Sequence, residues 1–149
     1  MAQDPDVAVQ WAVKGAFKAI WGMLARELEA HGLHPGQEHL LRQLWLEDGL
    51  PIGVLAERIG IEVPTVVRAV TRMEAAGILR REPDPTDRRR ALVLLTDRGR
   101  ELEQVVPQVL ADVDRRATAR LSEAERAELL RLLDEVWQGT RGTECTADS

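Results

Sequence analysis

The hydrophobic period of this chain is interrupted once, immediately after Gly77. Before that glycine, apolar residues recur every three or four positions, as they do in helices that bury one face. After it, two short apolar runs at 78–82 and 91–95 flank a turn rich in Asp and Pro, which predicts a β-hairpin. From Thr96 onward the helical period returns. The chain is therefore predicted to be mainly α with a small β-hairpin.

Glycines and prolines mark the ends of the predicted helices. Pro64 suits the first turn of a helix, and Gly77 suits a C-terminal stop. Thr96 is an expected N-cap, and Ser122 with Glu125 has the spacing of a capping box. The predicted helices cover residues 6–30, 35–48, 52–59, 64–76, 97–118 and 123–138.

The fourth predicted helix, 64–76, has one apolar and one polar face. We expect its core-facing residues to be Val67, Val70 and Met73. The opposite face then carries Thr65, Arg68 and Arg72.

Charge is distributed unevenly along the chain. The net charge is −5, yet residues 58–100 contain ten arginines and only six acidic residues. The rest of the chain has ten basic and nineteen acidic residues. Such segregation favours steering of a polyanion to one face, although a solvated basic surface would have the same composition.

Two adjacent predicted helices have the arrangement of a helix-turn-helix. Helices 52–59 and 64–76 are joined by the short glycine-containing segment 60–63. In this motif the second helix enters the major groove of DNA. Arg68 can fork onto a guanine edge or a phosphate, and Thr65 can reach either.

The hairpin follows the helix-turn-helix directly, which is the position of a wing. Its tip can lie along a minor groove, whose potential attracts arginine. The sequence gathers Arg88, Arg89 and Arg90 at this tip. We expect Asp87 to pair with an arginine such as Arg89 and to set the shape of the tip.

Residues 60–102 resemble the winged-helix core of the MarR family of bacterial transcription regulators. The specific elements are PTVVR, RMEAAGILRR, DPTDRR and LTDRG, while LHPGQEHLLRQL and LPIGVLAERIG fit the preceding helices more loosely. The resemblance implies one domain over 1–139, with a winged helix-turn-helix at about 36–96. Dimerisation helices would flank it at about 6–31 and 97–138. The polar segment 140–149 lies outside the resemblance and is expected to be a disordered tail.

The resemblance also implies roles for single residues. The DNA-contacting positions of the recognition helix would be Pro64, Thr65 and Arg68. Arg88 and Arg89 fall at the wing positions and Asp87 at that of the supporting acid, whereas Arg90 lies beside the pattern. Val63 departs from the polar residue often found just before such a helix, which removes a side-chain cap worth about 1 kcal/mol.

A dimer and an effector follow from the same resemblance. A homodimer would read a near-palindromic DNA site, with Trp11, Trp21 and Trp137 as packing anchors of its interface. Members of the family commonly release DNA when a small aromatic acid binds. The candidate effector-binding residues are Trp21, His39, Arg42 and Trp45, each of which could equally be structural.

Other function classes find little support in the sequence. There is no Gly-rich phosphate loop and no evident nucleophile–base pair, so no enzyme, catalytic residue or cofactor is expected. His31, His34 and His39 lack an obvious acidic or thiol partner, so no metal site is expected. A winged helix used only for protein contacts, without DNA readout, remains the alternative.

The location of the protein is also an expectation from the sequence. No apolar run approaches the ~20 residues that span a bilayer, and the N-terminus carries acidic residues where a signal peptide would be basic. We therefore expect a cytoplasmic protein with no membrane partner. Cys145 is the single cysteine and is expected to be incidental.

Overall fold

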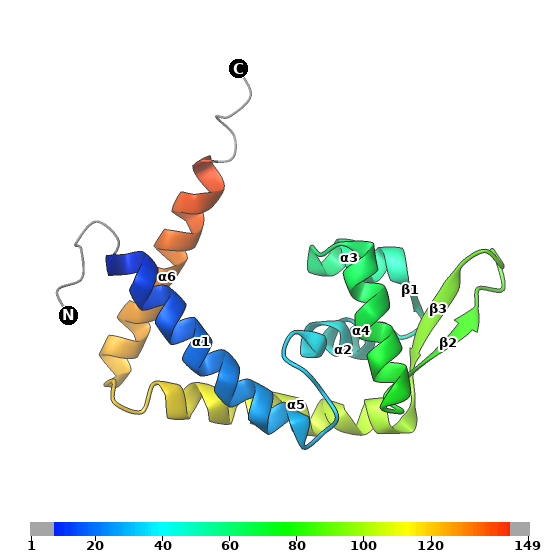
Figure 1. The fold of residues 1–149 in the computed structure, drawn as a ribbon, viewed down its shortest axis with the longest axis horizontal. Helices are drawn as coiled ribbons and strands as arrows, with labels where there is room; N and C mark the ends of the chain where they lie inside the picture. Colours follow the sequence, from blue (N-terminus) through cyan, green and yellow to red (C-terminus); the bar gives the residue numbers. More distant parts are fainter. Residues whose placement is uncertain (1–7, 144–149) are drawn as a thin grey trace. The chain divides into compact units, whose positions relative to one another are not determined.

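The computed structural model describes residues 8–143 and contains helices and a three-stranded antiparallel sheet (Figure 1). The helices of these residues are α1 (Ala8–Glu29), α2 (Gln37–Leu46), α3 (Ile52–Ile59), α4 (Val63–Ala75), α5 (Asp97–Ala117) and α6 (Glu123–Thr143). The strands are β1 (Leu50–Pro51), β2 (Leu79–Pro83) and β3 (Ala91–Leu95). The predicted fold class is confirmed.

The chain divides into two compact units. The first ends at Val113 and the second begins at Asp114. The first unit therefore holds α1 to α4, the sheet and most of α5, and the second holds the end of α5 and α6.

The core of the first unit is made where its helices meet the sheet. Leucine and valine side chains with no more than 1% exposure come from several elements: Leu28, Leu41, Leu55, Val70, Val93, Leu102 and Val106. They lie in a single apolar cluster, to which Trp45 and Val105 add half-buried surface. This cluster fixes the orientation of α4 and of the hairpin.

The buried face of α4 differs from the prediction at one of its three residues. Val66, Val70 and Met73 are fully buried, whereas Val67 is only half-buried. The observed spacing of four and then three residues follows the 3.6-residue period more closely than two steps of three. The expectation that Val67 faces the core was therefore wrong, and Val66 takes that place.

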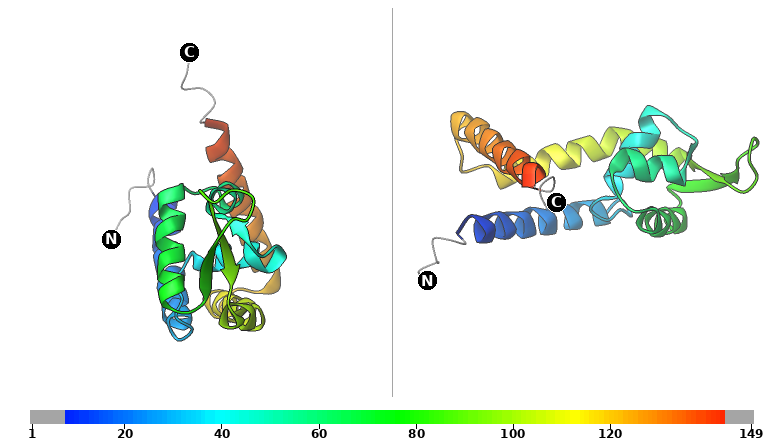
Figure 2. Two further views of the ribbon diagram at one scale, coloured as in Figure 1. Left: turned by 90° about the vertical axis from the view of Figure 1, so that its right-hand side faces the viewer. Right: turned by 90° about the horizontal axis from the view of Figure 1, so that it is seen from above.

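The predicted hairpin is present, and a third strand joins it. β2 and β3 pair antiparallel from Leu79↔Leu95 to Pro83↔Ala91. β1 pairs on the other side of β3, at Leu50↔Val93 and Pro51↔Leu92, which the sequence did not predict. Figure 2 shows the hairpin extending past the neighbouring helices as an arm.

The junction between β3 and α5 is closely packed. Thr96 caps α5 as predicted, because its Oγ1 accepts the Gly99 N–H at 3.2 Å. A Cβ added at Gly99 would lie 2.4 Å from the carbonyl oxygen of Ile78, so only glycine fits here. The indole Nε1–H of Trp45 donates to the Gly99 carbonyl at 3.0 Å. The start of α5 is thereby tied both to the end of the α4–β2 turn and to α2.

In the second unit, α6 begins with the predicted capping box. Glu125 N–H donates to Ser122 Oγ at 3.2 Å, and Ser122 N–H donates to Glu125 Oε2 at 2.8 Å. The pKa of the Glu125 carboxyl is lowered, first by the hydrogen bond from the Ser122 backbone N–H and then by the Ser122 side chain. The helix runs to Thr143 rather than ending near 138, so four residues of the expected tail are helical. Cys145 lies outside the described residues.

Candidate nucleic-acid interface

The two short helices α3 and α4 are joined by a tight turn. α3 ends at Ile59 and is capped by Gly60, whose φ of 68° is left-handed, and α4 begins three residues after this glycine. Pro64 lies in the first turn of α4, where its missing N–H leaves no helical hydrogen bond unmade. The cap position belongs to Glu62, which makes no side-chain capping bond, and Val63 is the first helical residue. The Glu62 side chain therefore does not occupy any backbone N–H group of the first turn of α4.

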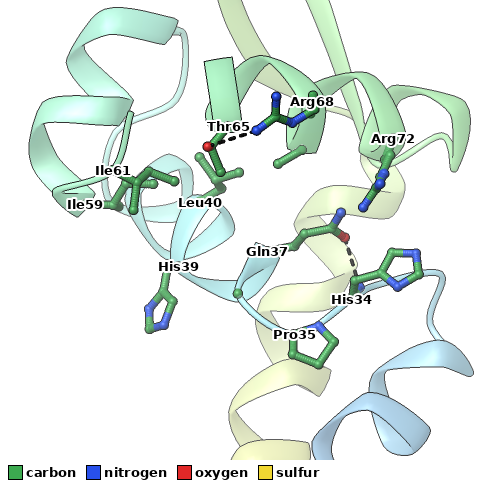
Figure 3. Close-up of a pocket in the computed structure, with 12 residues that line it drawn as sticks. His34, Pro35, Gln37, His39, Leu40, Ile59, Ile61, Thr65, Arg68 and Arg72 are labelled. Atoms are coloured by element: carbon green, nitrogen blue, oxygen red, sulfur yellow. Dashed lines mark hydrogen bonds between the residues drawn. The ribbon is translucent and has the colours of Figure 1, made fainter. Parts of the chain in front are cut away.

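The outward face of α4 carries the residues predicted for it. Thr65, Arg68 and Arg72 are all exposed. Arg68 Nη2 donates to Thr65 Oγ1 at 3.2 Å, which holds the guanidinium along the helix (Figure 3). This face presents two cations and a hydroxyl that can donate to acceptors on a ligand.

A hollow of about 350 Å³ separates this face from the start of α2. Figure 3 shows Arg68 and Arg72 on the α4 side of the hollow, with His34 and Gln37 opposite them. Gln37 Oε1 accepts the His34 N–H at 3.0 Å, and Glu38 Oε2 accepts the Gly36 N–H at 2.7 Å. Two side chains of the first helical turn therefore brace the preceding loop, which explains why Gln37 and Glu38 are buried.

The start of α2 differs from the prediction in this same loop. Pro35 was expected to open the helix, yet the helix begins at Gln37. Gly36 precedes it with a φ of 95°, which no helical residue adopts. Pro35 is therefore outside the helix, and the buried side chains of Gln37 and Glu38 are bent back to hold it there.

The tip of the hairpin is organised by Asp84, which the sequence analysis did not single out. The Asp84 carboxylate is buried and accepts Thr86 N–H at 2.9 Å, Thr86 Oγ1–H at 2.7 Å and Arg90 Nη2 at 2.8 Å. The two bonds from Thr86, followed by the bond from Arg90, lower the pKa of Asp84 to about 2. An Asp-Pro-Thr run is a typical Asx-turn sequence, so a signal for this role was present.

The arginines of the tip differ in what holds them. Asp87 Oδ1 accepts the Arg89 N–H at 3.1 Å and the Arg89 Nε–H at 3.2 Å, so the expected pair is present. The Arg89 side chain is nevertheless 91% exposed. Arg90 is pinned to Asp84 at the base of the tip, and Arg88 is exposed. Arg89 is therefore more accessible than Arg90.

A further side-chain cluster joins β2 to α4. Arg81 Nε and Nη2 donate to Glu74 Oε2 at 2.9 and 2.7 Å, and Nη2 also donates to Thr71 Oγ1 at 2.9 Å. The hydrogen bond to Glu74 raises the pKa of Arg81. Sequence reasoning missed this cluster, because Arg81 lies seven residues from Glu74, across a turn whose geometry sets their separation.

Three of the four candidate effector-binding residues come together. His39, Arg42 and Trp45 line a hollow of about 590 Å³ between α2 and α5, together with Leu46, Pro107 and Leu110. Trp21 is not among its lining residues and instead lies 5.2 Å from the Phe17 ring on α1. Because the Trp45 indole N–H is already bonded to Gly99, that side chain has a structural partner.

Two further kinds of feature bear on residues 8–143: metal sites and membrane-spanning helices. Within residues 8–143, no three His, Cys, Asp or Glu side chains are grouped so that they could hold a metal ion. In the same residues, no helix combines the length and apolar character needed to cross a bilayer.

Known proteins resemble this chain in sequence. A model of the MarR family matches residues 33–91. The HTH-type transcriptional regulator YkoM of Bacillus subtilis, which is uncharacterised, is 30% identical over 119 residues, covering 79% of this chain and 77% of YkoM. TtmR, an HTH-type transcriptional regulator of Methylorubrum extorquens, is 33% identical over 101 residues, covering 68% of this chain and 52% of TtmR.

A solved structure has a similar fold over a larger share of the chain. The PcaV transcriptional regulator of Streptomyces coelicolor is 25% identical, with a TM-score of 0.81 over 89% of this chain and 97% of that one. The chain spans less than two thirds of the length of some relatives: 52% of TtmR and 64% of a Thauera aromatica protein that is 31% identical over 107 residues.

Proposed function

This chain belongs to the MarR family, and we propose from that premise that it binds double-stranded DNA sequence-specifically and regulates transcription. The observation that carries the proposal is the outward face of α4. Thr65, Arg68 and Arg72 are exposed there, in the same unit as an arginine-bearing hairpin tip. The α4 helix, with Pro64 in its first turn, enters the major groove, which is about 12 Å wide. Arg68 reads a base edge or grips a phosphate.

The hairpin acts as the wing. Arg88 and Arg89 reach the adjacent minor groove, where a negative potential favours guanidinium groups. Asp87 holds Arg89 in an extended position through its two hydrogen bonds. Arg90 contacts DNA at the edge of the wing with the half of its side chain that is exposed, and it braces Asp84 with the rest.

The protein acts as a homodimer on a near-palindromic site. Several large apolar side chains of α1 and α6 are more than a third exposed: Val9, Trp11, Val13, Phe17, Ile20, Trp21, Leu129, Leu130, Leu132, Leu133, Val136 and Trp137. Exposed apolar surface of this extent is typical of protein–protein interfaces. A second copy covers it, and the two recognition helices then read half-sites about 10 bp apart.

A small anionic aromatic ligand releases the DNA, so that the protein is a repressor relieved by its effector. The hollow between α2 and α5 offers the Arg42 guanidinium and His39 beside the Trp45 ring, which suits a ring bearing a negative charge. Glu38 and Glu103 also line this hollow and restrict where a carboxylate can sit. The ligand must bind the non-DNA-binding arrangement more tightly, because only a difference in affinity shifts the population.

Selection of bound fragments from random DNA, with and without a panel of aromatic acids, tests the proposal. A single near-palindromic motif is expected, with fewer bound fragments in the presence of an effector. Arg68→Ala should weaken binding by about 1–3 kcal/mol and relax one base preference. Arg120→Ala, which removes an exposed arginine outside the winged helix, is the matched control and should leave the motif unchanged.

Salt dependence separates this function from a winged helix that binds only proteins. Binding to the selected DNA should fall steeply with salt, because released counterions drive it, and Arg89→Ala should lower the slope by about 1. Recovery of no motif, together with an unchanged slope, would leave the protein-contact alternative in its place.

A further inference from the structure

Two parts of the chain must reach DNA together if the proposed function holds. These are the outward face of α4 and the tip at residues 84–90. They are separated along the chain by the turn at Gly77, whose φ of 72° makes it a bend, and by the length of β2. The structure joins them through one side-chain cluster, Thr71, Glu74 and Arg81, which we call the helix–wing clamp.

The clamp is a chain of directed hydrogen bonds. Arg81 gives two N–H groups to Glu74 Oε2, at 2.9 and 2.7 Å, and reaches Thr71 Oγ1 at 2.9 Å. Thr71 Oγ1 donates in turn to the Val67 carbonyl at 2.8 Å, one turn back along α4. Three N–H···O contacts from one planar guanidinium restrict both distance and angle, which a single surface ion pair does not.

Both ends of the clamp lie beside residues that are buried in the core. Arg81 pairs in register with Val93 of β3, whose side chain is fully buried. Glu74 follows Met73, which is also fully buried in α4. The Arg81 and Glu74 side chains are only 30% and 28% exposed, so solvent screens their attraction less than it screens most surface pairs. A fixed link between two packed elements sets the angle at which the hairpin leaves the helix.

We propose that the helix–wing clamp is a positioning device for DNA binding, which holds the wing at the angle that lets its arginines reach one groove while α4 occupies the next. The inference rests on the proposed function of the same surface. Arg81 acts through the arginines at the tip rather than as a base-reading residue. Glu74 is an acidic residue kept within a DNA-directed surface, because it anchors the strand that carries the wing.

Because Glu74 is negatively charged, the direction in which its removal changes DNA affinity tests the proposal. Removing an acidic side chain near a polyanion should tighten binding if only charge matters. Glu74→Met removes the carboxylate but keeps the length of the side chain and its helix propensity. We expect it to weaken binding to the selected DNA by about tenfold despite the gain in net charge. Glu82→Met is the matched control, since it removes an exposed acid of β2 outside the clamp and should leave binding unchanged or tighter.

A double-mutant cycle identifies what the clamp positions. Arg89→Ala should weaken binding in the natural chain and have little further effect in Glu74→Met, which gives a coupling of about tenfold between two residues that do not touch. Glu74→Gln keeps an acceptor for Arg81 and should recover part of the loss. Thr71→Val removes both hydrogen bonds of the Thr71 hydroxyl, from Arg81 and to the Val67 carbonyl, at constant shape. It provides a second variant if Glu74→Met does not fold.

The outcomes are distinct. Equal or tighter binding by Glu74→Met, or losses from Glu74→Met and Arg89→Ala that simply multiply, would overturn the clamp and leave the DNA-binding proposal intact. No loss from Arg89→Ala alone would remove the wing from the DNA and overturn the clamp with it. Failure to select any DNA motif with the natural chain would overturn the proposed function first.

Discussion

Helices α4 and α6 have the same kind of sequence and opposite surroundings. Each repeats apolar residues at helical spacing. In α4 those residues, Val66, Val70 and Met73, are fully buried within the chain's own core. In α6 the large apolar side chains are between 38% and 61% exposed. The spacing of apolar residues along a helix therefore predicts that one face is buried. It does not predict whether that face packs against the same chain or against another.

The largest effect that would sharpen this comparison lies in the core beneath α4. Leu55 of α3 is fully buried, so Leu55→Ala should lower the free energy of unfolding by about 2–5 kcal/mol, from lost transfer energy and a cavity. Leu130→Ala in α6, where the side chain is 60% exposed, is the matched control. Chemical denaturation at a fixed protein concentration measures both. Equal losses at a concentration where the chain is monomeric would break the comparison.

A somewhat smaller effect is expected on association. Trp137 is 61% exposed on α6, and an aromatic anchor of an interface typically loses about 2 kcal/mol or more on truncation. Trp137→Ala should therefore raise the dimer dissociation constant by about thirtyfold or more. Sedimentation equilibrium measures it, with the natural chain expected at twice the monomer mass. A natural chain that stays monomeric would contradict the idea that a second copy covers α6.

The cap of α6 provides a smaller, local test. Ser122 accepts the Glu125 N–H and donates its own N–H to the Glu125 carboxylate. Ser122→Ala should lower the free energy of unfolding by about 1 kcal/mol, because it leaves one N–H of the first turn unbonded. Ser122→Asp, which retains a capping oxygen, should recover most of the loss. Thermal unfolding of the three chains would show no difference between them if α6 were held only by its partner.

The smallest expected effect is seen in the titration of one carboxyl group of the first unit. The pKa of Asp84 is lowered from 3.8 to about 2, first by the hydrogen bonds from Thr86 and then by that from Arg90. The ionised carboxylate therefore stabilises the folded tip above pH 3.8, and this contribution is lost as the pH falls toward 2. Carboxyl NMR should give a midpoint near 2. Thr86→Val should move it up more than Arg90→Met does, and the reverse order would show that charge rather than the turn dominates.

The sequence predicted the elements of the first unit well where one stretch of chain carried the whole signal. The hairpin, the Thr96 cap and the exposed face of α4 each depend on residues within a few positions, as does the capping box at Ser122 in the second unit. β1 was missed because two residues have no period of their own, and the strand exists only by pairing with Val93 and Leu92. Val67 was misplaced because two adjacent valines satisfy the same pattern, and only packing selects Val66.

The candidate site follows the same division. The sequence predicted the Asp87–Arg89 pair, since two residues of one turn can pair without distant help. It did not predict Arg81 with Glu74, which depends on how the turn at Gly77 brings strand and helix together. It set Arg90 beside the family pattern but did not predict its bond to Asp84, because that bond depends on how the tip folds.

The distribution of tryptophan gives this chain a built-in optical reporter. Of its four tryptophans, Trp11, Trp21 and Trp137 are between 42% and 61% exposed, whereas Trp45 is bonded inside the first unit, and the chain has no tyrosine. Intrinsic fluorescence therefore comes mostly from the three indole rings that are exposed in the single chain. Dilution of the unlabelled protein should shift that emission to longer wavelength as those rings become hydrated, while Trp45 contributes a nearly constant background.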